Sequence, residues 1–114
     1  MTRLAMNRDI NGFVTYGLPF ADASEKYSML LSAGVADSVT VPNYSAKYLA
    51  IFAYSPGAEV WVANNYTAAV PIGAAASTTS ELNPVAREVK AGDSLSFITP
   101  DSTARVAVIF LSRD

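Results

Sequence analysis

The sequence predicts an all-β protein: an antiparallel β-sandwich or jelly roll of about eight strands, preceded by an extended N-terminal arm. Two observations lead to this fold class. Most segments alternate between apolar and polar residues, or stay apolar for about four to eight residues, and then meet turn residues. These turns recur at short intervals throughout a chain of 114 residues, which is the size of one domain. We therefore expect an arm at residues 1–12 and a single sandwich domain at residues 13–114.

Turn residues separate the expected strands from one another. The sequence SPGA at residues 55–58 places Pro and Gly at the centre of a type II turn, and Asn64 and Asn65 can adopt the positive φ of a two-residue hairpin turn. The sequences AGD at residues 91–93 and PDS at residues 100–102 are expected to close the last two hairpins. The expected strands are residues 13–16, 27–32, 38–41, 48–54, 59–63, 66–70, 85–90, 95–99 and 105–112.

One segment, DASEKYSMLLSAG at residues 22–34, also fits a helix. Asp22 stands three residues before Glu25, as in a capping box, and the apolar residues that follow recur at helical spacing. A strand is favoured because residues 33–36 then form a hairpin turn into the next expected strand, and the helix remains the alternative.

Three expected strands are apolar on both faces, at residues 47–54, 59–63 and 105–111. A strand of an antiparallel sandwich normally buries one face and exposes polar groups on the other. Monomers seldom leave a large apolar patch in water, so something must cover the second face. Either the arm and the long loop fold over it, or a second subunit packs there. A content of 51% hydrophobic and only 16% charged residues also suggests cover from outside the monomer.

The composition excludes several classes of function. The chain has no cysteine and no histidine, which removes disulfide frameworks, most transition-metal sites and most hydrolase triads. Its net charge is −2 and its 8 basic residues are scattered, so we expect no nucleic-acid partner. No signal-peptide pattern and no membrane-length apolar run are present, so we expect a protein made in the cytoplasm without a membrane partner.

No residue pattern indicates catalysis. The sequence has no Gly-rich phosphate loop and no nucleophile elbow, and the spacing of its 10 acidic residues selects no catalytic pair. Trp61 together with Tyr48, Tyr54 and Tyr66 could form a platform for a sugar, but a core or interface role is favoured for these aromatic residues. We therefore expect no enzyme, no cofactor and no metal site.

The stretch SELNPVARE at residues 80–88 is predicted to be a long loop held against a sheet just before a β-hairpin. Asn83 can turn the chain by bonding to nearby backbone, and Pro84 favours an extended chain on either side. Arg87 and Glu88 are neighbours on the strand and should point to opposite faces.

Four segments together resemble a known class of protein: LLSAGVADSVTVP, KYLAIFAYSPGAEVWVANNYTAAVP, SELNPVARE and the apolar C-terminal strand. Their order is similar to that of small structural proteins of tailed phages, the capsid decoration proteins, also called cement or staple proteins. The resemblance spans residues 30–111, and ELNP with Arg87 is its most distinctive part. It implies a jelly-roll subunit, often a dimer or trimer, that clips onto the outside of an assembled shell.

The expected function is therefore that of a structural virion protein on the outer surface of a phage capsid. The implied partners are the major capsid protein and further copies of this chain, as a homodimer or homotrimer. A carbohydrate-binding sandwich module and a tail- or head-fibre-associated virion protein remain the alternatives. The expected protein-interface residues are Arg3, Arg8, Trp61, Tyr66, Glu81, Asn83 and Arg87.

Overall fold

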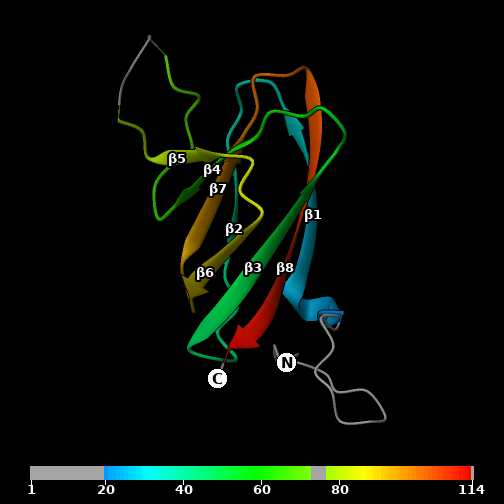
Figure 1. Ribbon diagram of the computed structural model, residues 1–114, viewed down its shortest axis with the longest axis vertical. Coiled ribbons are helices and arrows are strands. Elements are labelled where there is room, and N and C mark those ends of the chain that lie inside the picture. Colours follow the sequence, from blue (N-terminus) through cyan, green and yellow to red (C-terminus); the bar gives the residue numbers. More distant parts are fainter. Residues whose placement is uncertain (1–19, 73–76, 114) are drawn as a thin grey trace, which may run out of the picture.

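A computed structural model describes residues 20–72 and 77–113, and it arranges them as two four-stranded antiparallel sheets that lie face to face (Figure 1). Sheet 1 has the strand order β1-β8-β3-β6, and sheet 2 has the order β2-β7-β4-β5. The strands are β1 Lys26–Ser32, β2 Asp37–Thr40, β3 Lys47–Tyr54, β4 Trp61–Asn64, β5 Ser80–Leu82, β6 Ala86–Lys90, β7 Ser94–Ile98 and β8 Thr103–Arg113.

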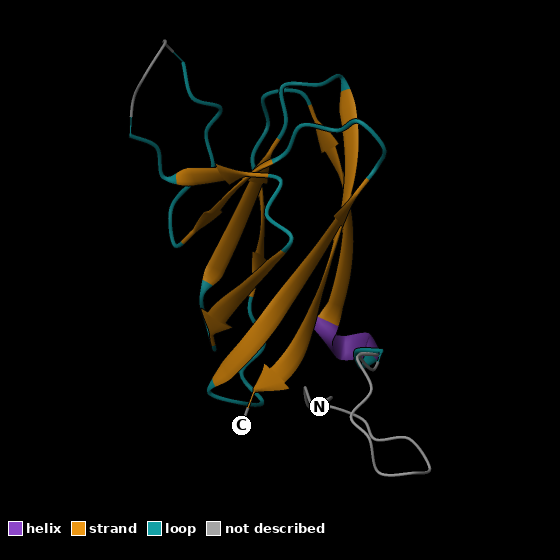
Figure 2. Ribbon diagram, in the orientation of Figure 1, coloured by secondary structure: helices purple, strands orange, loops and turns teal. Residues whose placement is uncertain are grey.

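The pairing pattern is that of a jelly roll. Strands pair first with last, so that β1 pairs with β8, β2 with β7, β3 with β6 and β4 with β5. This long double ribbon is rolled up until β3 also meets β8 and β4 also meets β7, which divides it into two sheets (Figure 2). The predicted antiparallel sandwich of about eight strands is confirmed.

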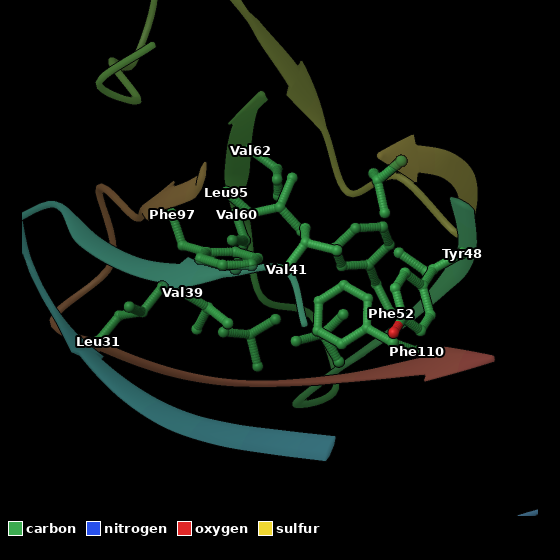
Figure 3. Packing of buried hydrophobic residues seen from close by; sticks show 14 of the residues in the cluster. Leu31, Val39, Val41, Tyr48, Phe52, Val60, Val62, Leu95, Phe97 and Phe110 are labelled. Carbon is green, nitrogen blue, oxygen red and sulfur yellow. The ribbon is translucent and has the colours of Figure 1, made fainter. Parts of the chain in front are cut away.

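The core lies between the sheets and is built from the inward face of each strand (Figure 3). Phe52 of sheet 1 meets Phe97 of sheet 2 edge to face, with ring centroids 6.1 Å apart. Near the lower end of the sandwich, Tyr48 packs in the same way against Phe110, at 6.2 Å. The alternation of buried and less buried residues along β3 therefore positions the aromatic side chains that join the two layers.

A short 3₁₀ turn, η1 at Ala23–Glu25, precedes β1, and the helix considered for this region is not formed. Asp22 makes no side-chain capping bond, and from Lys26 onward the backbone is extended. Glu25 is fully buried, where its carboxylate is a hydrogen-bonding partner of the Tyr48 hydroxyl. Pairing with β8 stabilises the strand form of a segment whose local spacing also suits a helix.

The expected strand at 66–70 is wrong, and a short strand, β5, was not expected. Residues 66–70 instead cross the outer face of sheet 2. There the Ala68 amide donates to the Ser96 hydroxyl (2.9 Å) and the Ala69 amide donates to the Ser80 hydroxyl (3.1 Å). Ala63 lies between these two serines in the sheet and is only 1% exposed. Residues 66–70 therefore cover this part of the outer face. Cover by a loop of the same chain was one of the two explanations for apolar outer faces, the other being cover by a second subunit.

The turns fall at the expected places, but none of the four expected hairpins is formed, the one at residues 64–65 because residues 66–70 are not a strand. Gly57 has φ +74° and the Ala58 amide donates to the Ser55 carbonyl (3.1 Å), as a type II turn requires. The turns at residues 33–36, 91–93 and 100–102, however, join strands of different sheets. Turn residues mark where a chain reverses, whereas the partner of the next strand depends on distant segments. The expected arm at residues 1–12 and the expected strand at residues 13–16 lie outside the described residues.

Candidate interaction site

Four of the seven residues expected at an interface lie together, where β5 of sheet 2 leads through Asn83 and Pro84 into β6 of sheet 1. We call this region the open edge and define it by Glu81, Leu82, Val85 and Arg87. Trp61 and Asn83 lie directly beside it, Trp61 opposite Leu82 in the ladder between β4 and β5.

Glu81 and Arg87 form an ion pair that spans the open edge from one sheet to the other. The guanidinium donates from Nε (3.0 Å) and from Nη2 (2.8 Å) to the same oxygen of Glu81. Glu81 lies opposite Val62 and Arg87 lies opposite Ala50, so both charged side chains occupy inward-facing positions of edge strands. Their side chains are still 61% and 49% exposed. The pair therefore closes the side of the sandwich while remaining in contact with water.

The electrostatics of the open edge follow from this pair. The hydrogen bond to Glu81 and the charge of that carboxylate raise the pKa of Arg87, so the arginine stays cationic. Arg87 also donates from Nη1 to the Ala86 carbonyl (2.7 Å), which occupies an acceptor on the outer edge of β6. Inward-pointing charges and occupied edge groups both discourage the addition of another strand.

Asn83 joins the connection between β5 and β6 to the connection between β3 and β4 through three hydrogen bonds. Its Oδ1 accepts from the Val60 amide (2.7 Å), its Nδ2 donates to the Ala58 carbonyl (2.9 Å), and its own amide donates to the Val60 carbonyl (2.8 Å). The residue has φ +43°, a left-handed conformation that Asn tolerates better than most residues. The amide is thus engaged within the chain, and a contact of Asn83 with a partner stays a prediction.

Trp61 belongs to an apolar row on the outer face of sheet 2. In the ladder it lies between Ile98 of β7 and Leu82 of β5, so the three side chains share one face. The indole N–H donates to the Glu59 carboxylate (2.9 Å), which fixes the ring against the sheet. Trp61 and Ile98 are half-buried, while Leu82 is 51% exposed.

A small cleft lies under the ion pair, with a volume of about 120 Å³. Core residues form its floor: Phe52, Val62, Val89 and Leu95. Pro84 also lines the cleft, and Val85, the next residue in the chain, is 67% exposed. The Tyr54 hydroxyl donates to the Pro84 carbonyl (2.6 Å), and burial raises the pKa of that hydroxyl. The open edge thus combines exposed apolar side chains, an ion pair and a rigid backbone.

A second apolar surface lies on the outer face of sheet 1. The β3–β8 ladder places three apolar pairs there in register: Leu49 with Leu111, Ile51 with Ile109, and Ala53 with Ala107. Leu111 is fully buried, Leu49, Ile51 and Ile109 are half-buried, and Leu30 on the neighbouring β1 is 58% exposed. Cover of this face by a second subunit stays a prediction.

The remaining expected interface residues do not join the open edge. Tyr66 lies on the outer face of sheet 2 and is 63% exposed. Arg3 and Arg8 lie outside the described residues. The aromatic platform considered for a sugar is not assembled from its four expected members, because Tyr48 is fully buried in the core and the Tyr54 hydroxyl is engaged by Pro84.

Comparisons with protein-family models, with curated proteins and with solved structures give no match. The site must therefore be interpreted from its own chemistry. Within residues 20–72 and 77–113, no three acidic side chains gather as they would around a metal ion. No helix in this part of the chain has the length and apolarity that a membrane crossing needs.

Leu82 and Val85 were not among the expected interface residues. Leu82 precedes the Asn83–Pro84 step in the segment expected to be loop, and Val85 follows that step as the first residue of an expected strand. The signal in the sequence was an apolar residue on each side of the Asn83–Pro84 turn, because apolar side chains at a turn become buried when the turn packs against a partner.

Proposed function

We propose that this chain is a structural virion protein that binds the outside of an assembled phage capsid and reinforces it. The proposal starts from the resemblance of its SELNP segment and neighbouring strands to capsid decoration proteins. In the structure it rests on one observation: two apolar side chains, Leu82 and Val85, are 51% and 67% exposed on either side of the Asn83–Pro84 step, with the charged Glu81–Arg87 pair next to them in the chain. An apolar centre with a charged rim is the usual composition of a protein-binding surface.

The fold suits this task. A decoration protein needs a rigid body, and the jelly roll supplies one through its closed pairing of first and last strands. The major capsid protein is the proposed partner at the open edge. A single such contact is small, but several copies linked in one oligomer raise the total affinity by about 10²–10⁴ through avidity.

The outer face of sheet 1 is the proposed contact between copies of the chain, as a homodimer or homotrimer. Its three in-register apolar pairs are of the kind that oligomer interfaces bury. Light scattering should show an oligomer in solution, and Ile51→Lys, which places a charge in the centre of this face, should reduce it to a monomer. A wild-type protein that is monomeric at high concentration would contradict this part of the proposal.

Capsid binding is tested by sedimentation of the purified protein with assembled shells that lack it. We expect the wild-type protein to pellet with the shells at micromolar concentration. Leu82→Ser and Val85→Ser should each weaken this binding by about tenfold, as the removal of an apolar contact at the centre of an interface does.

Val35→Ser is the matched control. Val35 is 54% exposed in the turn between β1 and β2, away from the open edge, so this variant should bind as the wild type does. If the wild-type protein stays in the supernatant, the proposed function is wrong. If it binds and all three serine variants bind equally well, the capsid contact lies elsewhere on the molecule.

A further inference from the structure

A groove on the outer face of sheet 2 is lined by hydroxyl groups and one tyrosine ring, and it lies outside the surface proposed to bind the capsid. Its volume is about 320 Å³, and we call it the Tyr66 groove. Ser38 of β2 and Ser96 of β7 are direct cross-strand neighbours on its floor, and Ser94 continues the same face of β7. The residues that line it are Ser38, Asn65, Tyr66, Thr67, Ser94 and Ser96.

The wall of the groove is fixed to the sheet beneath it. Asn65 has φ +64° and is held to β7 on both sides: its amide donates to the Ser94 carbonyl (2.7 Å), and its Oδ1 accepts from the Ser94 amide (2.9 Å). Its Nδ2 also donates to the Asp93 carboxylate (3.2 Å). Three residues further on, the Ala68 amide donates to the Ser96 hydroxyl (2.9 Å). Tyr66 and Thr67 lie between these two anchored points, so the groove is preformed.

Among the residues that the structure describes, those that line the groove have many hydroxyl groups and no charged side chain. Four serine or threonine hydroxyls, together with the Tyr66 phenol, can each both donate and accept hydrogen bonds. The Ser96 oxygen accepts from Ala68 and can still donate its own proton. A ligand that carries hydroxyl groups of its own fits this pattern, whereas an anion or a cation finds no opposite charge in the lining.

The Tyr66 ring supplies the apolar part of the same site. It is 63% exposed beside the hydroxyl groups, although an exposed tyrosine contributes nothing to the core. An aromatic ring favours contact with the C–H face of a sugar, while the sugar hydroxyls bind polar groups around it. The volume is at the lower end of the range of about 300–1,000 Å³ that is usual for ligand pockets, which leaves room for one or two sugar rings.

We propose that the Tyr66 groove binds a neutral carbohydrate of one or two rings, with Tyr66 stacked on one sugar face and the hydroxyls of Ser38, Thr67, Ser94 and Ser96 bonded to the other groups. The groove differs from the sugar platform considered from the sequence, since Tyr66 is the one member of that platform that takes part. The inference does not depend on the proposed function, because the groove is separate from the open edge.

The test uses the isolated full-length protein labelled with ¹⁵N and a panel of named probes: methyl α-glucoside, methyl β-galactoside, N-acetylglucosamine and lactose. Each is added to about 50 mM, which exceeds the millimolar dissociation constants of a shallow site. We expect at least one probe to shift the amide resonances of Tyr66, Thr67 and Ser94 in a saturable way. Glucuronic acid, the charged counterpart, should bind more weakly than the neutral probe that binds best.

Tyr66→Ala should weaken the binding of that probe by about tenfold or more through loss of the stacked ring. Tyr44→Ala is the matched control, because Tyr44 is 61% exposed in the connection between β2 and β3, outside the groove. A second variant, Thr67→Val, removes one hydroxyl at nearly constant volume and should also weaken binding. Thermal unfolding of each variant shows whether the fold is retained.

Three outcomes would overturn the inference. The first is that none of the four neutral probes shifts any resonance. The second is that shifts occur but lie away from the Tyr66 groove, or persist unchanged in both Tyr66→Ala and Thr67→Val. The third is that glucuronic acid binds better than every neutral probe. None of these outcomes bears on co-sedimentation with shells, so the two proposals fail independently.

Discussion

Asn83 pairs with Val60 through both its backbone and its side chain. The Asn83 amide donates to the Val60 carbonyl at 2.8 Å, and the Asn83 side-chain oxygen accepts from the Val60 amide at 2.7 Å. The side chain thus completes a bridge of the kind that a further strand residue would make, at the corner where β5 leaves sheet 2. This bridge connects two turns that are more than twenty residues apart in the chain, and it locates the open edge relative to β3 and β4.

The first prediction concerns the stability of this corner. Asn83→Ala should lower the free energy of unfolding by about 2–3 kcal/mol, because it leaves the Val60 amide and the Ala58 carbonyl without partners and places alanine at a positive φ. Asn83→Gly should be less damaging, since glycine adopts the positive φ freely. Urea unfolding of both variants measures the difference. If both variants unfold with the same free energy as the wild type, water replaces the hydrogen bonds of the Asn83 side chain at no cost in stability.

The second prediction separates structure from binding at Arg87. Because its ion pair with Glu81 is largely exposed, Arg87→Ala should change the melting temperature by no more than about 3 °C. The same variant should clearly weaken co-sedimentation with shells, since it removes a charge from the rim of the open edge. Asp37→Asn is the control: this carboxylate is exposed on β2, at the edge of sheet 2 opposite β5, and its loss should leave binding unchanged. Parallel losses of stability and binding in Arg87→Ala would mean that the arginine is only structural.

The third prediction is a dependence of stability on acid that involves Asp93. Burial raises the pKa of this carboxyl, but hydrogen bonds from the Lys90 amide and the Asn65 side chain outweigh it and hold the pKa below its ordinary value. A lowered folded-state pKa stabilises the protein above the unfolded-state pKa of about 4, and this contribution disappears as the pH falls through the folded-state pKa.

Asp93→Asn should therefore be less stable than the wild type by about 1 kcal/mol at pH 7, a modest figure because solvent screens the site. The difference between the two proteins should shrink steadily as the pH falls below about 4. Chemical unfolding at a series of pH values gives both curves. A constant difference across the whole range would show that the effect of the substitution comes from shape and not from charge.

The fourth prediction concerns alkaline pH and Tyr54. Burial raises the pKa of its hydroxyl above the ordinary value, although the nearby Arg87 opposes the shift. A raised folded-state pKa stabilises the protein below the unfolded-state pKa of about 10, and this contribution is lost as the pH rises above it. At pH 8, Tyr54→Phe should thus be less stable than the wild type by about 1 kcal/mol, because it lacks the hydrogen bond to the Pro84 carbonyl. Between pH 8 and pH 11, the free energy of unfolding should fall less in Tyr54→Phe than in the wild type, because phenylalanine does not ionise. Parallel pH curves for the two proteins would contradict this assignment.

The sequence alone was sufficient to predict the fold class and most of the strands. The local pattern was strongest in β3 and β8, where apolar residues continue for many positions and no helix boundary is present. It failed at residues 66–70, which have the composition of a strand but bond to the hydroxyls of Ser80 and Ser96 instead of to another strand. Such a contact depends on serines elsewhere in the chain, and local periodicity does not contain it.

The candidate site was predicted in part. The loop predicted for the SELNP segment is wrong over Ser80–Leu82, which form β5, whereas the predicted opposite orientation of Arg87 and Glu88 follows from their places in β6. The pairing of Arg87 with Glu81 across two sheets was not predicted, because it requires knowing that β5 and β6 end beside each other. The exposed pair Leu82 and Val85 was missed for the same reason: an apolar residue can be assigned to core or surface only after the strands are placed.

The position of β8 in sheet 1 has a consequence for how the protein is made. This strand follows the other seven in the sequence, yet it lies between β1 and β3, which leave the ribosome well before it. Sheet 1 therefore cannot close until β8 has been made, and its earlier strands wait with unpaired edges until then. Because almost every strand pairs with a distant one, folding should also take milliseconds to seconds, as is usual for β-sandwiches. Newly made chains should thus depend on chaperones that shield these edges, and truncation within β8 should yield aggregated protein instead of a shortened domain.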